Sequence, residues 1–258
     1  MAVVDIHTHI LPGVDDGAES LEEAVEMVTM AAADGTSAMV ATPHCNALYS
    51  FARERNEKLL AELRDAVGAR MELALGCDFH LSYENLQAVL AGNRSHTVNR
   101  GPYLLVELAD YALPPQLAES LHQLRVQSLI PIITHPERNP LLQRRGIKLL
   151  RQLIAMGCPL QITAGSLLGH FGRPARRMAR ELLQNEMVHV VASDAHDAKN
   201  RTPRLSEAYA LVEQSFGAAR AQALFADNPR AVTDGKQLPY RPEPAPPRRK
   251  RRFIFFGF

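Results

Sequence analysis

Short apolar runs alternate with amphipathic stretches along this chain of 258 residues. The runs are rich in valine, isoleucine and leucine, and the stretches between them have the apolar spacing of helices. We expect strands at VVDIHT (3–8), SAMVAT (37–42), MELALG (71–76), YLLVEL (103–108), LIPIIT (129–134), CPLQIT (158–163) and MVHVVAS (187–193). We expect helices at 20–35, 51–67, 84–90, 115–126, 141–156, 173–185, 205–216 and 218–226.

About seven alternations of strand and helix are typical of a parallel sheet covered by helices. The sequence therefore predicts an α/β fold with one domain over residues 1–238 and a tail over 239–258. A sheet of this kind that closes into a barrel brings the carboxyl ends of all its strands to one rim, where such barrels have their active sites.

Six of the seven predicted strands end in a histidine or a carboxylate. In the first of them, His7 and His9 are two residues apart and therefore share one face of the strand. The polar strand ends carry His7 with His9, His44, Asp78, Glu107, His135 with Glu137 and Arg138, and Asp194 with His196. Gathered on one rim, these side chains predict a site for several metal ions.

The number of expected ligands exceeds what one ion can bind. Asp15 and Asp16 follow the first strand in a turn marked by Pro12, Gly13 and Gly17, close enough to fold back over the same ion. Five histidines and four carboxylates suit two or three divalent ions, manganese, iron or zinc rather than calcium or magnesium. Their surplus positive charge would bind a bridging hydroxide and an anionic substrate, which suits attack on a phosphate ester. The expected ligands are His7, His9, Asp16, His44, Asp78, Glu107, His135, Asp194 and His196.

Two arginines lie in loops that reach the same rim. Arg138 is three residues after His135, and Arg201 is five residues after His196. A guanidinium donates two parallel hydrogen bonds to phosphate oxygens. We therefore expect these arginines to clamp the ester and stabilise its transition state.

Composition places the chain among globular proteins rather than membrane proteins. It is 46% hydrophobic and 22% charged, and no run approaches the roughly 18 apolar residues that span a bilayer. Asp5 and His7 interrupt any signal-peptide core, so we expect a cytoplasmic protein. The three cysteines, Cys45, Cys77 and Cys158, have no C-x-x-C spacing, and we expect them to be small core residues.

The formal net charge of +1 hides an unbroken basic run at residues 248–252. Without these five residues, 24 basic side chains face 28 acids, so the body is mildly acidic and we expect no nucleic-acid partner. The tail combines prolines, this basic run and four phenylalanines. It suits either a disordered extension or peripheral contact with an anionic membrane.

The motifs D-I-H-T-H, G-V-D-D-G, T-P-H, H-P-E-R and S-D-A-H span nearly the whole chain in this order. The chain thereby resembles the bacterial protein tyrosine phosphatases of the polymerase and histidinol phosphatase (PHP) superfamily. The resemblance implies a distorted (β/α)7 TIM-like barrel and a trinuclear, usually manganese-activated site. It implies that the substrate is a phosphotyrosine protein. That protein would be a membrane-associated tyrosine kinase that controls capsule and exopolysaccharide synthesis. It also implies that Arg138 and Arg201 bind phosphate and that metal is bound by His7, His9, Asp16, His44, Glu107, His135, Asp194 and His196.

One position departs from the family pattern. The family usually has Gly-x-Glu-Ile after the third strand, whereas this chain has Gly76-Cys77-Asp78-Phe79, so the ligand is one methylene shorter. His80 is an alternative ligand on the same strand face. His96, His122, His170 and His189 are interpreted as structural, although the glycine-rich segment around His170 suits a flexible loop that lines the substrate cleft.

Other functions remain open at this point. Another phosphoesterase of the superfamily, such as a histidinol phosphatase or a nuclease, has the same ligands, and a regulatory module would keep the fold without turnover. Cysteine-dependent phosphatases use a His-Cys-x5-Arg loop, but here seven residues separate Cys45 from Arg53. Two extra residues would spoil the short backbone arc of that loop, so His44 is assigned to metal and Cys45 to packing.

Overall fold

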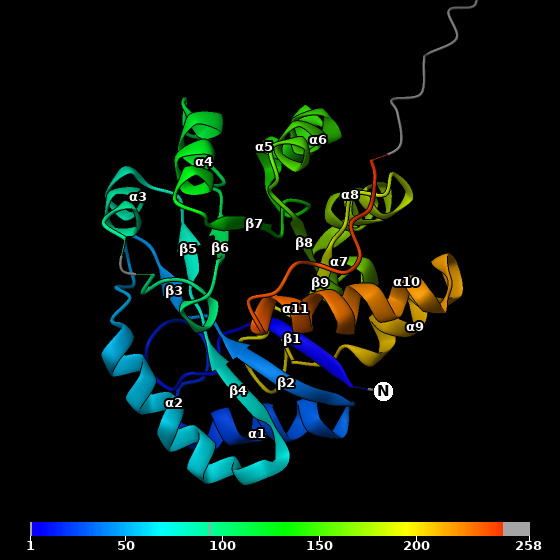
Figure 1. The fold of residues 1–258 in the computed structure, drawn as a ribbon. Coiled ribbons are helices and arrows are strands. Elements are labelled where there is room, and N and C mark those ends of the chain that lie inside the picture. The colour runs from blue at the N-terminus through cyan, green and yellow to red at the C-terminus, as the bar shows by residue number, and fades with distance from the viewer. Residues whose placement is uncertain (1, 93, 245–258) are drawn as a thin grey trace, which may run out of the picture.

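The computed structural model describes residues 2–92 and 94–244, whose nine strands are all parallel and form two sheets (Figure 1). The first sheet has the order β1-β2-β4, and the second has the order β3-β5-β6-β7-β8-β9. The strands are β1 (Val3–Thr8), β2 (Thr36–Ala41), β3 (His44–Cys45), β4 (Glu72–Leu75), β5 (Asp78–His80), β6 (Tyr103–Glu107), β7 (Ile130–Thr134), β8 (Leu160–Thr163) and β9 (Val190–Ala192). All seven predicted strands are present.

Two of the predicted strands continue past a break into a short second strand. β2 is followed by β3 across Pro43, which has no N–H group for the ladder, and β4 is followed by β5 across Gly76 and Cys77. Backbone hydrogen bonds run on through both breaks, from Gly76 N to Ala41 O at 2.8 Å and from Asp78 N to Pro43 O at 3.1 Å. The breaks turn β3 and β5 into the second sheet.

The other edges of the two sheets meet near the end of β1. Thr8 forms an isolated bridge with Ala195, and Asp194 N donates to His7 O at 2.9 Å. Strand pairing within the described ranges nevertheless gives two sheets rather than one closed barrel. The structure therefore shows an α/β fold with parallel sheets.

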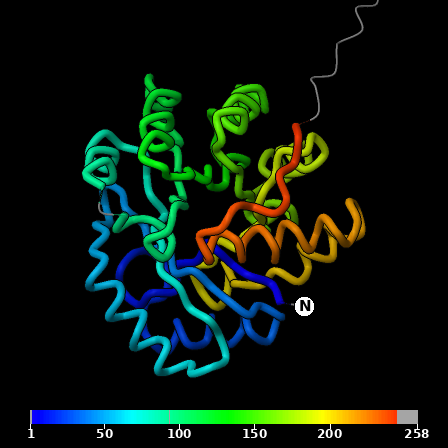
Figure 2. The backbone as a smooth tube through the Cα atoms, in the orientation of Figure 1, coloured from blue at the N-terminus to red at the C-terminus, as the bar shows by residue number. Residues whose placement is uncertain are grey.

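Helices follow most strands and cover the outer faces of the sheets (Figures 1 and 2). They are α1 (Leu21–Ala33), α2 (Arg53–Val67), α3 (Tyr83–Leu90), α4 (Leu117–Val126), α5 (Pro140–Arg145), α6 (Ile147–Ala155), α7 (Ala164–Leu168), α8 (Gly172–Gln184), α9 (Ser206–Phe216), α10 (Ala218–Gln222) and α11 (Asn228–Thr233). A π-helical turn at Ala223–Asp227 joins the last two. Ser20 caps α1, because its side chain accepts a hydrogen bond from Glu23 N.

Two helical predictions need correction. The single helix predicted at 141–156 is broken into α5 and α6 at Gly146, whose φ of 68° lies in the left-handed region that interrupts a right-handed helix. The glycine-rich segment predicted as a flexible loop instead forms α7, which ends at Gly169 with φ of 98°. Gly146 thus ends α5 where the sequence predicted that the helix continues. Gly169 ends α7, a helix that the sequence did not predict.

Apolar side chains fill the space on both faces of the strands. On β6, Leu105 packs inward with Ile132 of β7, while Leu104 and Val106 pack outward against helices. Val232 of α11 belongs to the inner cluster, and α11 packs on β1. The apolar interior leaves polar side chains at the carboxyl ends of the strands.

Tyr240, just past the predicted domain boundary at residue 238, contacts the body of the protein. Tyr240 donates through its hydroxyl to Glu186 at 2.8 Å, and its backbone N donates to Asn228 at 2.9 Å. The basic and phenylalanine-rich part of the tail, residues 245–258, lies outside the described residues. No helix in residues 2–92 and 94–244 is both long and apolar enough to cross a membrane.

Candidate metal centre

The structure brings the nine predicted ligands together at the carboxyl ends of the strands. They form four overlapping groups within the described part of the chain, and in each group one ligand atom per residue lies within 4.8 Å of the others. The groups are His9, Asp16, His44 and His196; His7, Asp78 and His135; His7, His9 and Asp194; and His44, Asp78 and Glu107. Shared members link the groups, so the arrangement is one cluster with several places for an ion.

His7 and His9 project from the end of β1 and are completely buried. The Nδ1 atom of His7 lies 2.8 Å from Gln161 Oε1, and that of His9 lies 2.7 Å from Asp15 Oδ2. Because each Nδ1 faces an oxygen, the proton of the neutral ring belongs there and the lone pair of Nε2 points to the cluster. The two Nε2 atoms are 3.4 Å apart, a contact that a shared cation would relieve.

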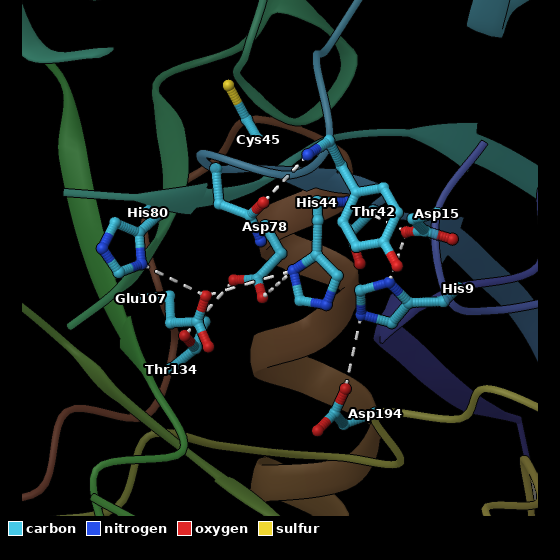
Figure 3. A network of polar contacts seen from close by, with 12 residues as sticks. His9, Asp15, Thr42, His44, Cys45, Asp78, His80, Glu107, Thr134 and Asp194 are labelled. Carbon is cyan, nitrogen blue, oxygen red and sulfur yellow. Dashed lines mark hydrogen bonds and ion pairs between the residues drawn. The ribbon is translucent and has the colours of Figure 1, made fainter. Parts of the chain in front are cut away.

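Asp78 occupies the middle of the cluster and is fully buried (Figure 3). Its Oδ2 lies 3.2 Å from His44 Nδ1, 3.6 Å from His7 Nε2 and 3.9 Å from His135 Nε2. Neither Asp78 Oδ2 nor His44 Nδ1 has a hydrogen-bond partner among the described residues. A buried carboxylate oxygen needs such a partner or a cation, so this atom fits a metal ligand.

Asp194 connects the cluster to the two predicted arginines. Its Oδ1 faces His7 Nε2 at 3.5 Å and His9 Nε2 at 3.4 Å. Its Oδ2 accepts from Arg138 and from Arg201, the latter at 2.7 Å. Both guanidinium groups lie over the ring of Phe171, with 4.3 Å and 5.7 Å from their central carbons to the ring centre.

The outer side of the cluster is open to solvent. Asp16 has a side chain that is 49% exposed and lies 3.3 Å from His44 Nε2 and 3.6 Å from His196 Nε2. Glu107 lies 3.6 Å from the alternative ligand His80. His80 belongs to none of the four groups in the described residues, so the geometry favours Asp78 over His80.

The acids and histidines strongly perturb one another. Burial alone would lower the pKa of His7, but the charges of Asp78 and Asp194 outweigh burial and raise it to about 9. Burial would raise the pKa of Asp78, but His7, His135 and His44 hold it well below its usual range. A divalent ion can replace the protons that these histidines otherwise hold, so the donor set fits bound metal.

Backbone strain aims two of the side chains. His135 has φ of 32° and Asp194 has φ of 54°, a region that residues other than glycine rarely adopt. His135 directly follows β7 and Asp194 lies two residues after the end of β9, and the unusual backbone conformation directs both side chains into the cluster. Such strain is typical of functional sites.

A family model for capsular polysaccharide synthesis proteins, CpsB/CapC, matches residues 3–234. The chain belongs to this family. The family resemblance predicted from the sequence is thereby confirmed.

Several curated relatives of this CpsB/CapC chain are named tyrosine-protein phosphatases. YwqE of Bacillus subtilis is 31% identical over 98% of the chain and all of the relative. CpsB of Streptococcus pneumoniae is 30% identical over 89% of the chain and 98% of the relative.

Solved structures agree with this assignment. A structure from a study of YwqE and CpsB, described there as unique metal-dependent tyrosine phosphatases, matches with a TM-score of 0.84 and 31% identity, covering 94% of this chain and 98% of the other. A phosphotriesterase from Mycobacterium tuberculosis matches with a TM-score of 0.59 and 10% identity, over 90% and 94% of the two chains. At that identity the second likeness shows the fold alone.

Two residues of this CpsB/CapC site, Gln161 and Phe171, were not predicted, and Asp15 has a role other than the one expected. Asp15 supports His9 instead of folding over an ion, and its Oδ2 also accepts from His44 N at 3.0 Å. Gln161 supports His7, and Phe171 lies beneath the arginines. Glu137, in contrast, turns away and accepts from Thr163 N at 2.9 Å and Ser166 Oγ at 2.7 Å.

A cavity of about 500 Å³ lies directly beside the cluster. Its walls include the charged residues Asp194 and Arg201 together with Leu168, His170 and Phe171. The glycine-rich segment around His170 therefore lines a cleft, as expected, although it does so from the end of a helix. Polar and apolar walls together suit a substrate with an anionic end and an aromatic or aliphatic body.

Proposed function

We propose that this chain is a metal-dependent protein tyrosine phosphatase that acts in capsule or exopolysaccharide synthesis. The observation that carries the proposal is the shared position of Asp194, which faces two histidines with one oxygen and two arginines with the other. A metal cluster and a phosphate clamp thereby meet at one point. The names of the relatives support phosphotyrosine as the substrate.

Two or three divalent ions fit the nine ligands. His7, His9, Asp78 and Asp194 would hold the buried ions, while Asp16, His44, Glu107, His135 and His196 would complete the outer positions. Mixed imidazole and carboxylate ligands favour manganese, with iron or zinc as the other candidates. When bound, such ions activate water for attack on phosphorus and offset the charge of the phosphate.

Arg138 and Arg201 would bind and orient the phosphate. Each guanidinium has five N–H donors in a rigid plane, and Phe171 supports that plane from below. A bound phosphate would take hydrogen bonds from both groups beside Asp194. Charge that builds up on the phosphate oxygens during hydrolysis is then stabilised by donors already in place.

The cavity beside Asp194 would take the tyrosine ring. Phe171 and Leu168 offer apolar contact to the ring. Arg201, one of the two arginines of the phosphate clamp, also lines this cavity. Because the cavity opens to the surface, a tyrosine that projects from a protein chain can reach it. A membrane-associated tyrosine kinase is the substrate that the family resemblance favours.

The two sheets are best understood as a distorted seven-stranded barrel. Continuity through Pro43 and Gly76 and the bridge from Thr8 to Ala195 support this interpretation. In such a barrel the cluster lies at the carboxyl ends of the strands, the usual position of an active site.

The proposal is tested by comparing turnover of a phosphotyrosine peptide, histidinol phosphate and a phosphodiester by the metal-loaded protein. We expect the peptide to have the highest kcat/KM. Arg138→Ala should lower that value by about a hundredfold or more without changing the metal content, whereas the exposed Arg145→Ala on α5 serves as a control. Preference for histidinol phosphate or the diester would replace phosphotyrosine as the substrate, and absence of turnover with any of them would favour a regulatory module.

A further inference from the structure

A basic groove lies along α8, outside the metal centre. Arg173, Arg176, Arg177 and Arg180 are exposed and lie at helical spacings of three and four, on one face of α8. They line a cavity of about 1110 Å³, whose other walls include Phe216 and Arg220. We refer to this cavity as the α8 groove.

The positive charge of the α8 groove is largely uncompensated. Five arginines face two glutamates on its walls, and Arg220 already pairs with Glu186 at 2.7 Å. The other four arginines form no ion pair within residues 2–92 and 94–244. Like charges three and four residues apart repel one another and destabilise a helix, so an anionic partner would relieve this repulsion.

The α8 groove lies next to the two arginines that are proposed to bind phosphate. Phe171, which carries Arg138 and Arg201 over its ring, immediately precedes α8. The side chain of Arg176 reaches back to Gly169 at the end of α7, within 3.5 Å of where a Cβ would lie. The 13 residues of α8 extend over ~20 Å, the length of about six residues of extended chain.

We propose that the α8 groove binds an acidic segment of the phosphoprotein substrate, next to its phosphotyrosine. The proposal rests on the proposed phosphatase function and adds to it a basis for choosing among tyrosines. Carboxylates suit the unpaired guanidinium groups, and the hollow shape between α8 and Phe216 fits a chain better than a flat bilayer. The basic residues 248–252 of this chain have the wrong charge to fill it.

The test compares two phosphotyrosine peptides, one with aspartates and glutamates beside the phosphotyrosine and one with asparagines and glutamines in their place. Arg177→Glu/Arg180→Glu is the test variant, and Lys58→Glu/Arg70→Glu, on exposed positions of α2 and the turn after it, is the matched control. We expect the test variant to lose about tenfold in kcat/KM for the acidic peptide, through KM, since two charge contacts are reversed. The neutral peptide and a small aryl phosphate should show no change.

Direct binding separates this proposal from the phosphatase proposal. The unphosphorylated acidic peptide should bind the wild-type protein and the control more tightly than the test variant, by fluorescence anisotropy, even if no phosphotyrosine is hydrolysed. Arg177→Gln/Arg180→Gln repeats the comparison should the double glutamate variant unfold. Equal peptide binding by all variants would overturn the proposal. Loss of binding to anionic vesicles with peptide binding unchanged would also overturn it, and would assign the groove to a lipid surface.

Discussion

The central carbon of the Arg138 guanidinium lies over the Phe171 ring, 4.3 Å from the ring centre. Arg201 approaches the same ring at 5.7 Å. A cation over an aromatic face gains about 0.5–2 kcal/mol, and the ring also restricts where the guanidinium can lie. We therefore propose Phe171 as a positioning residue for the two arginines of the proposed phosphate clamp.

Phe171→Leu should lower kcat/KM for a phosphotyrosine peptide by about fivefold, because the arginines lose about 1 kcal/mol of support. Phe171→Tyr keeps the ring and should retain activity. Metal content, measured by elemental analysis, should be equal in all three proteins. A leucine variant with wild-type kinetics would show that Asp194 alone positions the arginines.

Asp15 is predicted to act through His9. Its Oδ2 holds His9 Nδ1 at 2.7 Å, and its Oδ1 accepts from Gly17 N at 3.0 Å. Asp15→Asn removes the charge that makes His9 a stronger ligand, and metal affinity should fall about 10–100-fold. Competition with a chelator measures the affinity, and Asp65→Asn, exposed on α2, is the control. Unchanged affinity would limit Asp15 to shaping the loop.

The sequence predicted the members of the cluster better than their supports. Histidines and acids at strand ends are chemically distinctive, and strand periodicity places them on one rim. Asp15 and Asp16 are identical neighbours, and only the turn after β1 decides that Asp15 points inward to His9 while Asp16 faces solvent. Phe171 gave no signal, because a phenylalanine in a glycine-rich segment is usually a packing residue.

Cys45 is predicted to be dispensable for catalysis. Hydrogen bonds from Cys77 and, to a lesser degree, His96 lower the pKa of its thiol to about 5 despite burial, as in nucleophilic cysteines. However, its side chain points away from His44 and Asp78 (Figure 3), and it belongs to the apolar core. Cys45→Ser should retain most phosphotyrosine hydrolysis, whereas His44→Ala should lose it together with bound metal. A folded, fully metallated but inactive Cys45→Ser protein would instead favour a covalent phosphocysteine.

His189 should make the fold sensitive to acid. It is 5% exposed, and burial, with a smaller contribution from Arg241, lowers its pKa from 6.5 to about 4. The unfolded chain takes up the proton first as pH falls, so stability is lost between pH 6.5 and 4, by up to about 3 kcal/mol. Leu160 N donates to His189 Nδ1, and His189→Asn keeps an acceptor there. Urea unfolding from pH 7 to 4 should show a smaller loss for the variant, and parallel curves would contradict the assignment.

The strands and most helices could be predicted from the sequence, but the helix break at Gly146 and the division of the strands into two sheets could not. Alternating apolar runs identify all seven strands, because each is buried on both faces. Gly146 breaks a helix that its neighbours would continue. Its φ of 68° depends on tertiary packing, which the local sequence does not show. The division into two sheets depends on pairing at Pro43 and Gly76, between residues far apart in the chain.

The metal dependence of phosphotyrosine hydrolysis tests the central claim most directly. The protein is stripped with a chelator and titrated with Mn²⁺, Fe²⁺ or Zn²⁺, while bound metal per chain and phosphate release from a phosphotyrosine peptide are measured together. We predict no turnover without metal, and full turnover, best with Mn²⁺, when two to three ions are bound per chain. Full turnover by the metal-free protein would contradict the account.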